Sequence, residues 1–173
     1  KLTSAFIVAA AASDAPTISL DLGKLHQHGR VGHLGLVGTA HARLHHHLTS
    51  KSVNTAKVHV CTANNFNNNN GKNNNVDVRK GCALPVAKAY DHHDGALNVA
   101  TTVLLVRSEG KNNANVAAGA KGSCTQTPSM TKSCGQKFID YSLRSEYIIK
   151  YDAKDRSGND AEQVVFAVIL QDH

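Results

Sequence analysis

The stretch YIIKYDAKDRSGN at residues 147–159, followed by the apolar run VVFAVIL at residues 164–170, decides the fold. In an extended chain successive side chains point to opposite faces, so Tyr147, Ile149 and Tyr151 share one face of a strand. Asp155 to Gly158 has the composition of a turn, because aspartate bonds to its own backbone and glycine adopts positive φ. The apolar run then returns as a second strand. The pattern predicts an antiparallel hairpin of two long strands, around which the remaining strands pack.

The composition favours one domain built from sheets. The chain has 173 residues, of which 41% are hydrophobic but only 5% aromatic, and there is no tryptophan. A chain of this length buries a substantial core, which here is aliphatic and suits packed sheets. The net charge is +6, but the lysines and arginines are scattered. Because nucleic-acid binding needs a clustered basic surface, we expect no nucleic-acid partner.

Alternating and apolar segments mark the other strands. They lie at residues 17–22, 53–61, 83–90, 99–107 and 136–141, with a turn at Asp91 to Gly95 and a loop at residues 111–122. The run from Val103 to Val106 is apolar on both faces, which predicts a central strand. No segment has a convincing helical pattern of ten or more residues. The pattern predicts an all-β antiparallel sandwich of about seven or eight strands with long loops.

Three motifs in order carry a family resemblance. Tyr147-x-Ile149-x-Tyr151-x-Ala153-x-Asp155-x-x-Gly158-Asn159 resembles the closing hairpin of Ig-like modules of the hyalin-repeat type, which occur in tandem on microbial and animal surface proteins. Asp14-Ala15-Pro16-x-Ile18 and Ala89-x-Asp91-x-x-Asp94-Gly95 lie upstream in that family's order, and Ile139-Asp140 also fits. Ser145 replaces the usual glycine, and residues 23–81 have no counterpart. The resemblance implies an Ig-like sandwich at residues 15–173, located outside the cell or on its surface.

The four cysteines, Cys61, Cys82, Cys124 and Cys134, form no CxxC pair, so a zinc knuckle has little support. In the extracellular setting that the resemblance implies, an even count indicates two disulfides. Three pairings are open, and we favour the sequence-local one, Cys61 with Cys82 and Cys124 with Cys134. Four reduced, buried thiols are the alternative.

Residues 1–14 form an N-terminal extension with three interpretations: a secretory signal peptide, the closing strand of a preceding module, or a strand lent to a neighbour. The segment from Ala5 to Ala12 is apolar on both faces, and an unpaired strand of this kind exposes backbone donors and acceptors. Paired with another copy, it would build a head-to-tail filament through Phe6, Ile7 and Val8. The alternative is that the segment folds back into its own sandwich.

The strand that accepts such a segment should be apolar on both faces. The best candidate is the run that closes the hairpin, and its candidate acceptor residues are Val164, Val165, Phe166, Val168 and Ile169.

Two biased tracts are predicted as insertions. Residues 24–48 are rich in histidine, which favours metal binding by composition, yet no ligand spacing such as H-E-x-x-H is present. Val31 to Gly38 alternates like a strand pair weakened by glycine, so we expect the histidines to face solvent. Residues 62–81 are rich in asparagine and predict a long exposed loop. The chain has no N-x-[ST] acceptor, so O-linked sugars are the candidates, at Thr125, Thr127, Ser129 and Thr131.

The sequence offers no recognisable catalytic motif. There is no nucleophile elbow, phosphate-binding loop or apolar span of transmembrane length. Asp91, Asp94, Asp155 and Asp160 can gather at one end of a sandwich, where carboxylates sometimes hold calcium. Their spacing does not match the EF-hand loop, so we interpret them as turn residues. We expect no enzyme, no cofactor, no bound metal and no membrane span.

The favoured hypothesis is an extracellular structural subunit that polymerises head-to-tail into a pilus-like fibril by donating its N-terminal strand. Its partners would be other copies of itself, together with surface glycans. The alternative is an adhesive Ig-like module of a larger cell-surface protein, in which residues 1–14 belong to the preceding module. A metal-binding protein that acts through its histidine tract is a minor alternative.

Overall fold

Strands make up most of the described chain. The computed structural model describes residues 14–22, 29–33, 44, 48, 56–63, 83–109, 115–116, 118–141 and 144–172. The elements are β1 (Thr17–Leu20), β2 (Gly29–His33), β3 (Lys57–Ala63), β4 (Ala87–Asp91), β5 (Gly95–Leu97), β6 (Val99–Glu109), β7 (Asn115–Val116), β8 (Gly119–Gln126), the 3₁₀ helix η4 (Cys134–Phe138), β9 (Arg144–Asp152) and β10 (Val164–Asp172).

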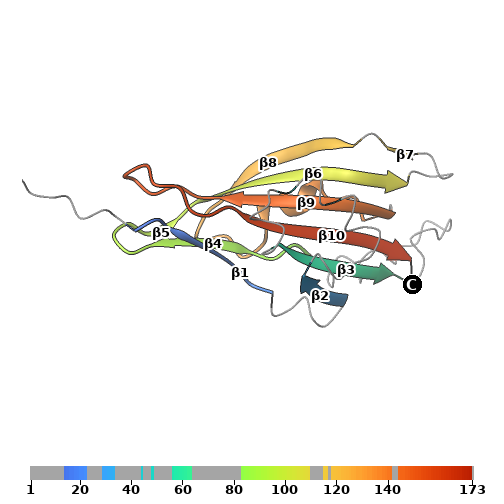
Figure 1. The fold of residues 1–173 in the computed structure, drawn as a ribbon, viewed down its shortest axis with the longest axis horizontal. Helices are drawn as coiled ribbons and strands as arrows, with labels where there is room; N and C mark the ends of the chain where they lie inside the picture. The colour runs from blue at the N-terminus through green and yellow to red at the C-terminus, as the bar shows by residue number, and fades with distance from the viewer. Residues whose placement is uncertain are drawn as a thin grey trace, which may run out of the picture.

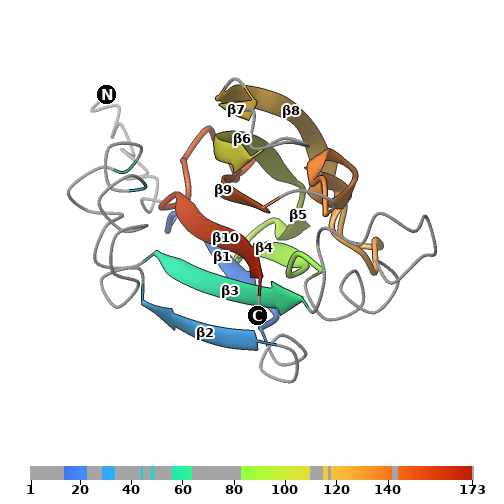
Figure 2. The same ribbon diagram turned by 90° about the vertical axis from the view of Figure 1, so that its right-hand side faces the viewer.

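The strands form two sheets that pack face to face (Figure 1; Figure 2). The small sheet has the order β1-β4-β5. The large sheet has the order β2-β3-β10-β9-β6-β7, and β8 also pairs with β6. The predicted all-β sandwich is confirmed, although one strand pair, β3 with β10, is parallel. The described residues contain more strands than the seven or eight expected, because β5 follows the turn after β4 and the 111–122 segment contributes β7 and the start of β8.

The hairpin predicted from residues 147–170 lies in the middle of the large sheet. β9 and β10 are antiparallel, with Val164 opposite Tyr151 and Leu170 opposite Ser145. Tyr147, Ile149 and Tyr151 face the core between the sheets, as the alternation predicts, and the β10 side chains Phe166, Val168 and Leu170 pack into the same core. The strand predicted to be central, β6, pairs with β9 on one side and with β7 and β8 on the other.

The outer face of the large sheet is also buried. Ile148 on β9 and three β10 side chains form a second apolar cluster with Leu44, Ala56 and Val58, and Leu48 packs against it. The β10 residues of this cluster are Val165, Ala167 and Ile169. Both faces of the hairpin are therefore removed from water, which is why β10 reads as a continuous apolar run instead of alternating with polar residues.

β3 connects the hairpin to the edge of the large sheet. It pairs in parallel with β10, with Lys57 opposite Phe166, and antiparallel with β2, with His33 opposite Lys57. Of the glycine-weakened strand pair predicted over Val31 to Gly38, residues 31–33 lie in β2, one of the outer strands of the large sheet, and residues 34–38 lie outside the described residues. On β3, His59 is fully buried, and its two ring nitrogens lie 3.6 and 3.7 Å from Cys61 Sγ.

The strand predicted at residues 136–141 is wrong, because this segment begins inside η4. The backbone N–H of Ile139 donates to the carbonyl of Gln136 at 3.2 Å, which closes a tight helical turn. The side chain of Gln136 accepts a hydrogen bond from the Leu84 N–H at 2.6 Å and donates one to the hydroxyl of Tyr141. The Gln136 side chain thus bonds to Tyr141 nearby and to Leu84, which is 52 residues away in the chain, without the ladder of a neighbouring strand.

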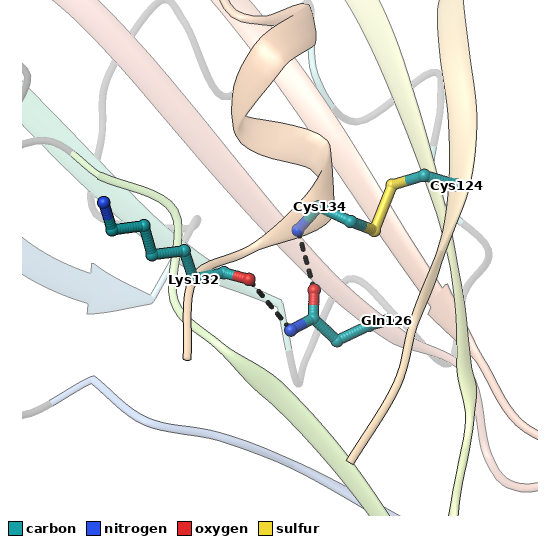
Figure 3. The surroundings of a disulfide bond; sticks show 4 residues. All are labelled: Cys124, Gln126, Lys132 and Cys134. Carbon is teal, nitrogen blue, oxygen red and sulfur yellow. Dashed lines mark hydrogen bonds between the residues drawn. A yellow bond between two sulfur atoms is a disulfide. The ribbon is translucent and has the colours of Figure 1, made fainter. Parts of the chain in front are cut away.

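A disulfide joins η4 to β8 (Figure 3). Cys124 and Cys134 are bonded, as the local pairing predicts, with a Cα–Cα distance of 6.0 Å. Gln126 is buried beside the disulfide: its Nε2 donates to the Lys132 carbonyl at 3.0 Å, and its Oε1 accepts from the Cys134 N–H at 2.7 Å. Cys61 is disulfide-bonded too, and its predicted partner, Cys82, lies outside the described residues.

Candidate functional site

Two turns from different sheets meet at one end of the sandwich, on the left in Figure 1. The first joins β4 to β5, where Asp91 pairs with Gly95, whose φ is 75°. The second joins β9 to β10 and contains Gly158, with φ 90°. Both glycines adopt the left-handed conformation that a tight turn needs and that other residues rarely adopt. The turns predicted from Asp94-Gly95 and from Asp155 to Gly158 are both confirmed.

Asp91 organises the first turn from inside. Its Oδ1 accepts hydrogen bonds from the N–H groups of His93 and Asp94, both at 2.8 Å. The side chain is only 2% exposed, and its second oxygen, Oδ2, is buried without a hydrogen-bond partner among the described residues. A buried acceptor without a partner costs about 1–3 kcal/mol of folding free energy. Capping the turn therefore explains one oxygen of this carboxylate and leaves the other unexplained.

The second turn has its own aspartate. Asp155 is 5% exposed, and its two oxygens accept from the backbone N–H and the side-chain Nδ2 of Asn159, each at 2.8 Å. Its backbone N–H donates to the Asn159 carbonyl at 3.0 Å. A direct bond also links the two turns: the N–H of Arg156 donates to Asp94 Oδ2 at 2.7 Å.

These contacts bring three carboxylates together. One oxygen each from Asp91, Asp94 and Asp155 lies within 4.8 Å of the others. Like charges at this separation repel, and more strongly where burial excludes water. The arrangement has the donor set of a hard cation site. The fourth predicted aspartate, Asp160, is not part of the cluster; it is exposed and pairs with Lys154 at 3.5 Å.

The sequence suggested that four aspartates can gather at one end of the sandwich, and the structure brings three of them together. Asp91 and Asp155 lie far apart in the chain, and no local spacing reports that the two turns share one end of the sandwich. The glycines after each aspartate are a signal for the turns alone. Asp91, Asp94 and Asp155 are therefore turn residues, as the sequence predicts. That interpretation does not account for the close approach of their carboxylates.

The predicted acceptor strand needs correction. Within this chain, β10 has β9 on one side and β3 on the other from Phe166 to Leu170, so Phe166, Val168 and Ile169 have no free backbone edge. Among the described strands, Val164 and Val165 pair with β9 alone. The apolar character of β10 reflects two buried faces and does not mark an open edge. The outer strands of the described sheets are β1 and β5 in the small sheet, and β2, β7 and β8 in the large one.

The remaining predicted sites fall in three places. Phe6, Ile7 and Val8 lie outside the described residues, as do residues 64–81 of the asparagine-rich tract and most of the histidine-rich tract. The candidate sugar-bearing residues Thr125, Ser129 and Thr131 are exposed, whereas Thr127 is partly buried and its Oγ1 lies 3.3 Å from Ser129 Oγ.

Within the described residues, no helix has the length and apolarity to span a membrane.

Two core tyrosines have perturbed acidity. Burial raises the pKa of Tyr147, whose hydroxyl accepts a hydrogen bond from the Asp140 N–H at 3.1 Å. Burial also raises the pKa of Tyr151, with a smaller contribution from nearby Tyr141, and the Tyr151 hydroxyl has no hydrogen-bond partner in the described structure. Both tyrosines stay protonated well above neutral pH, so their role here is packing.

Comparison with known proteins adds no relative: no family model, curated protein or solved structure matches the chain.

Proposed function

We propose that this chain is an extracellular, Ig-like structural subunit that polymerises head-to-tail, with residues 1–14 of one copy adding a strand to a sheet of the next. The observation that carries the proposal is the position of β1. This strand follows directly on the N-terminal segment, lies at the edge of the small sheet, and pairs with β4 alone among the described strands. The position of β1 at a sheet edge supports an arrangement in which the segment before it pairs with a neighbouring copy.

The sheet edges supply the acceptor. An edge strand presents a row of unpaired N–H and C=O groups, which is the template for strand addition. The outer side of β1 is one such edge, and its side chains Ile18 and Leu20 are only partly buried against the core. A donated strand with Phe6, Ile7 and Val8 would add main-chain hydrogen bonds and cover this apolar margin. An exchange of this length buries about 1,500 Å² or more, an area typical of stable interfaces.

The test compares the full chain with a variant lacking residues 1–13 and with Ile7→Asp, by light scattering after size exclusion and by negative-stain imaging. Met130→Asp is the matched control, because it places the same charge on an exposed apolar residue of the loop between β8 and η4. We expect filaments from the full chain and from Met130→Asp, and folded monomers from the other two. Deletion without any effect on assembly would refute strand donation. A full chain that stays monomeric would favour the adhesive-module alternative.

A further inference from the structure

We propose that Asp91, Asp94 and Asp155 bind one Ca²⁺ ion that joins the β4–β5 turn to the β9–β10 turn. The three carboxylates offer oxygens within 4.8 Å of one another. The independent observation is Asp91 Oδ2, an oxygen of a 98% buried side chain that has no hydrogen-bond partner in the described structure although Oδ1 has two. A cation held among the three carboxylates would give this oxygen a partner.

The donor set favours calcium over other common metals. All three ligands are carboxylate oxygens, which suit hard cations, whereas zinc prefers nitrogen and sulfur. Ca²⁺ binds oxygens at 2.3–2.6 Å, so two of its ligands lie up to about 5.2 Å apart, which accommodates the observed cluster. Mg²⁺ needs near-ideal octahedral geometry at about 2.0–2.1 Å, so its ligands span at most about 4.2 Å. Carbonyls and water complete the larger shell of calcium.

The ion would act between the two sheets. Asp91 and Asp94 belong to the turn of the small sheet, and Asp155 belongs to the turn of the large sheet. The hydrogen bond from the Arg156 N–H to Asp94 Oδ2 already links the two turns, so the binding of the ion needs little rearrangement of the turns. Thr17 at the start of β1 pairs with Tyr90, one residue before Asp91. The ion would therefore lie close to the beginning of β1.

The experiment uses the full chain after treatment with a chelator and titrates it with CaCl₂ or MgCl₂ by calorimetry, with thermal unfolding measured in parallel. We expect one Ca²⁺ per chain with a dissociation constant of about 10⁻⁴–10⁻³ M, as for extracellular calcium modules, and at least tenfold weaker binding of Mg²⁺. Saturation at about 100 times the dissociation constant should shift the unfolding equilibrium about 100-fold toward the folded state.

Two variants decide whether these residues hold the ion. Asp91→Asn keeps an oxygen that can accept the His93 and Asp94 N–H bonds, so the turn should form, but calcium binding should fall at least tenfold. Asp94→Asn, at a partly buried position, gives a second measurement should Asp91→Asn fail to fold. Asp160→Asn is the matched control and should bind calcium like the parent. Absence of calcium binding at millimolar concentration, or equal binding by both cluster variants and the parent, would overturn the proposal.

Discussion

Removal of the Cys124–Cys134 disulfide should destabilise the fold by an amount that the loop length predicts. The bond closes a short loop, since the two cysteines are 10 residues apart. In the chain-entropy description, a cross-link over this separation removes about 9 cal/mol/K of unfolded-state entropy, or about 2.7 kcal/mol at 25 °C. In the folded state the loop has a second restraint, because Gln126 bonds to the backbone of both Lys132 and Cys134.

The double variant Cys124→Ala/Cys134→Ala should therefore fold, with a free energy of unfolding about 2–3 kcal/mol lower than the parent. For a chain of this size, the midpoint of thermal unfolding should fall by about 5–10 °C. Equilibrium urea denaturation without reductant is the suitable assay, because it leaves the Cys61 disulfide intact in both proteins. Thr125→Ala, an exposed position beside Cys124, is the control and should change stability by less than about 0.5 kcal/mol.

Either of two results would refute this reasoning. A loss below about 1 kcal/mol would mean that residual structure already restricts this loop in the unfolded chain, so that the cross-link removes little further entropy. A protein that does not fold at all would mean that the disulfide forms part of the folded scaffold and does more than restrict the unfolded chain.

Two further predictions concern packing and pH. Gly122→Ala should cost about 1–3 kcal/mol in urea denaturation, because a Cβ at this position overlaps the ring of Phe138, which must then move; wild-type stability would contradict the packing. Stability should decline above about pH 10, because the unfolded chain ionises Tyr151 near its ordinary pKa of 10.0 while the folded chain keeps it protonated to higher pH. Tyr151→Phe should flatten that decline and, by removing an unpartnered buried hydroxyl, raise stability at pH 7 by about 1 kcal/mol; an unchanged pH profile would contradict the assignment.

The parts of the fold that the sequence predicts are those encoded locally. The alternation of Tyr147, Ile149 and Tyr151 and the glycines of the two turns report backbone geometry over a few residues, and β9, β10 and both turns follow from them. The local disulfide was predictable for the same reason. The segment at residues 136–141 was not, since its hydrogen bonds run through the side chain of Gln136 to Leu84 and Tyr141, and no periodicity encodes such a contact.

The burial of the second face of β10 and the convergence of the three carboxylates were harder to predict than the strands themselves. A strand that is apolar on both faces can line an open groove, or it can have its second face covered by other residues. For β10 the second alternative holds, because its outer side chains pack in one cluster with Ile148 and Leu44. The carboxylate cluster depends on the relative position of two sheets, to which Asp91 and Asp155 each contribute one turn. Local chemistry identified the residues, whereas their meeting depends on tertiary structure.

The parallel pairing of β3 with β10 has a consequence for biogenesis. The two strands are separated by about one hundred residues, and such non-local pairings slow folding because a long loop must close first. As the polypeptide leaves the ribosome, β3 cannot form its hydrogen bonds with β10 until residues 164–172 have been synthesised. Nascent chains at that stage would be targets for chaperones and prone to mispairing with one another, so a cell making this protein should need to shield its first half.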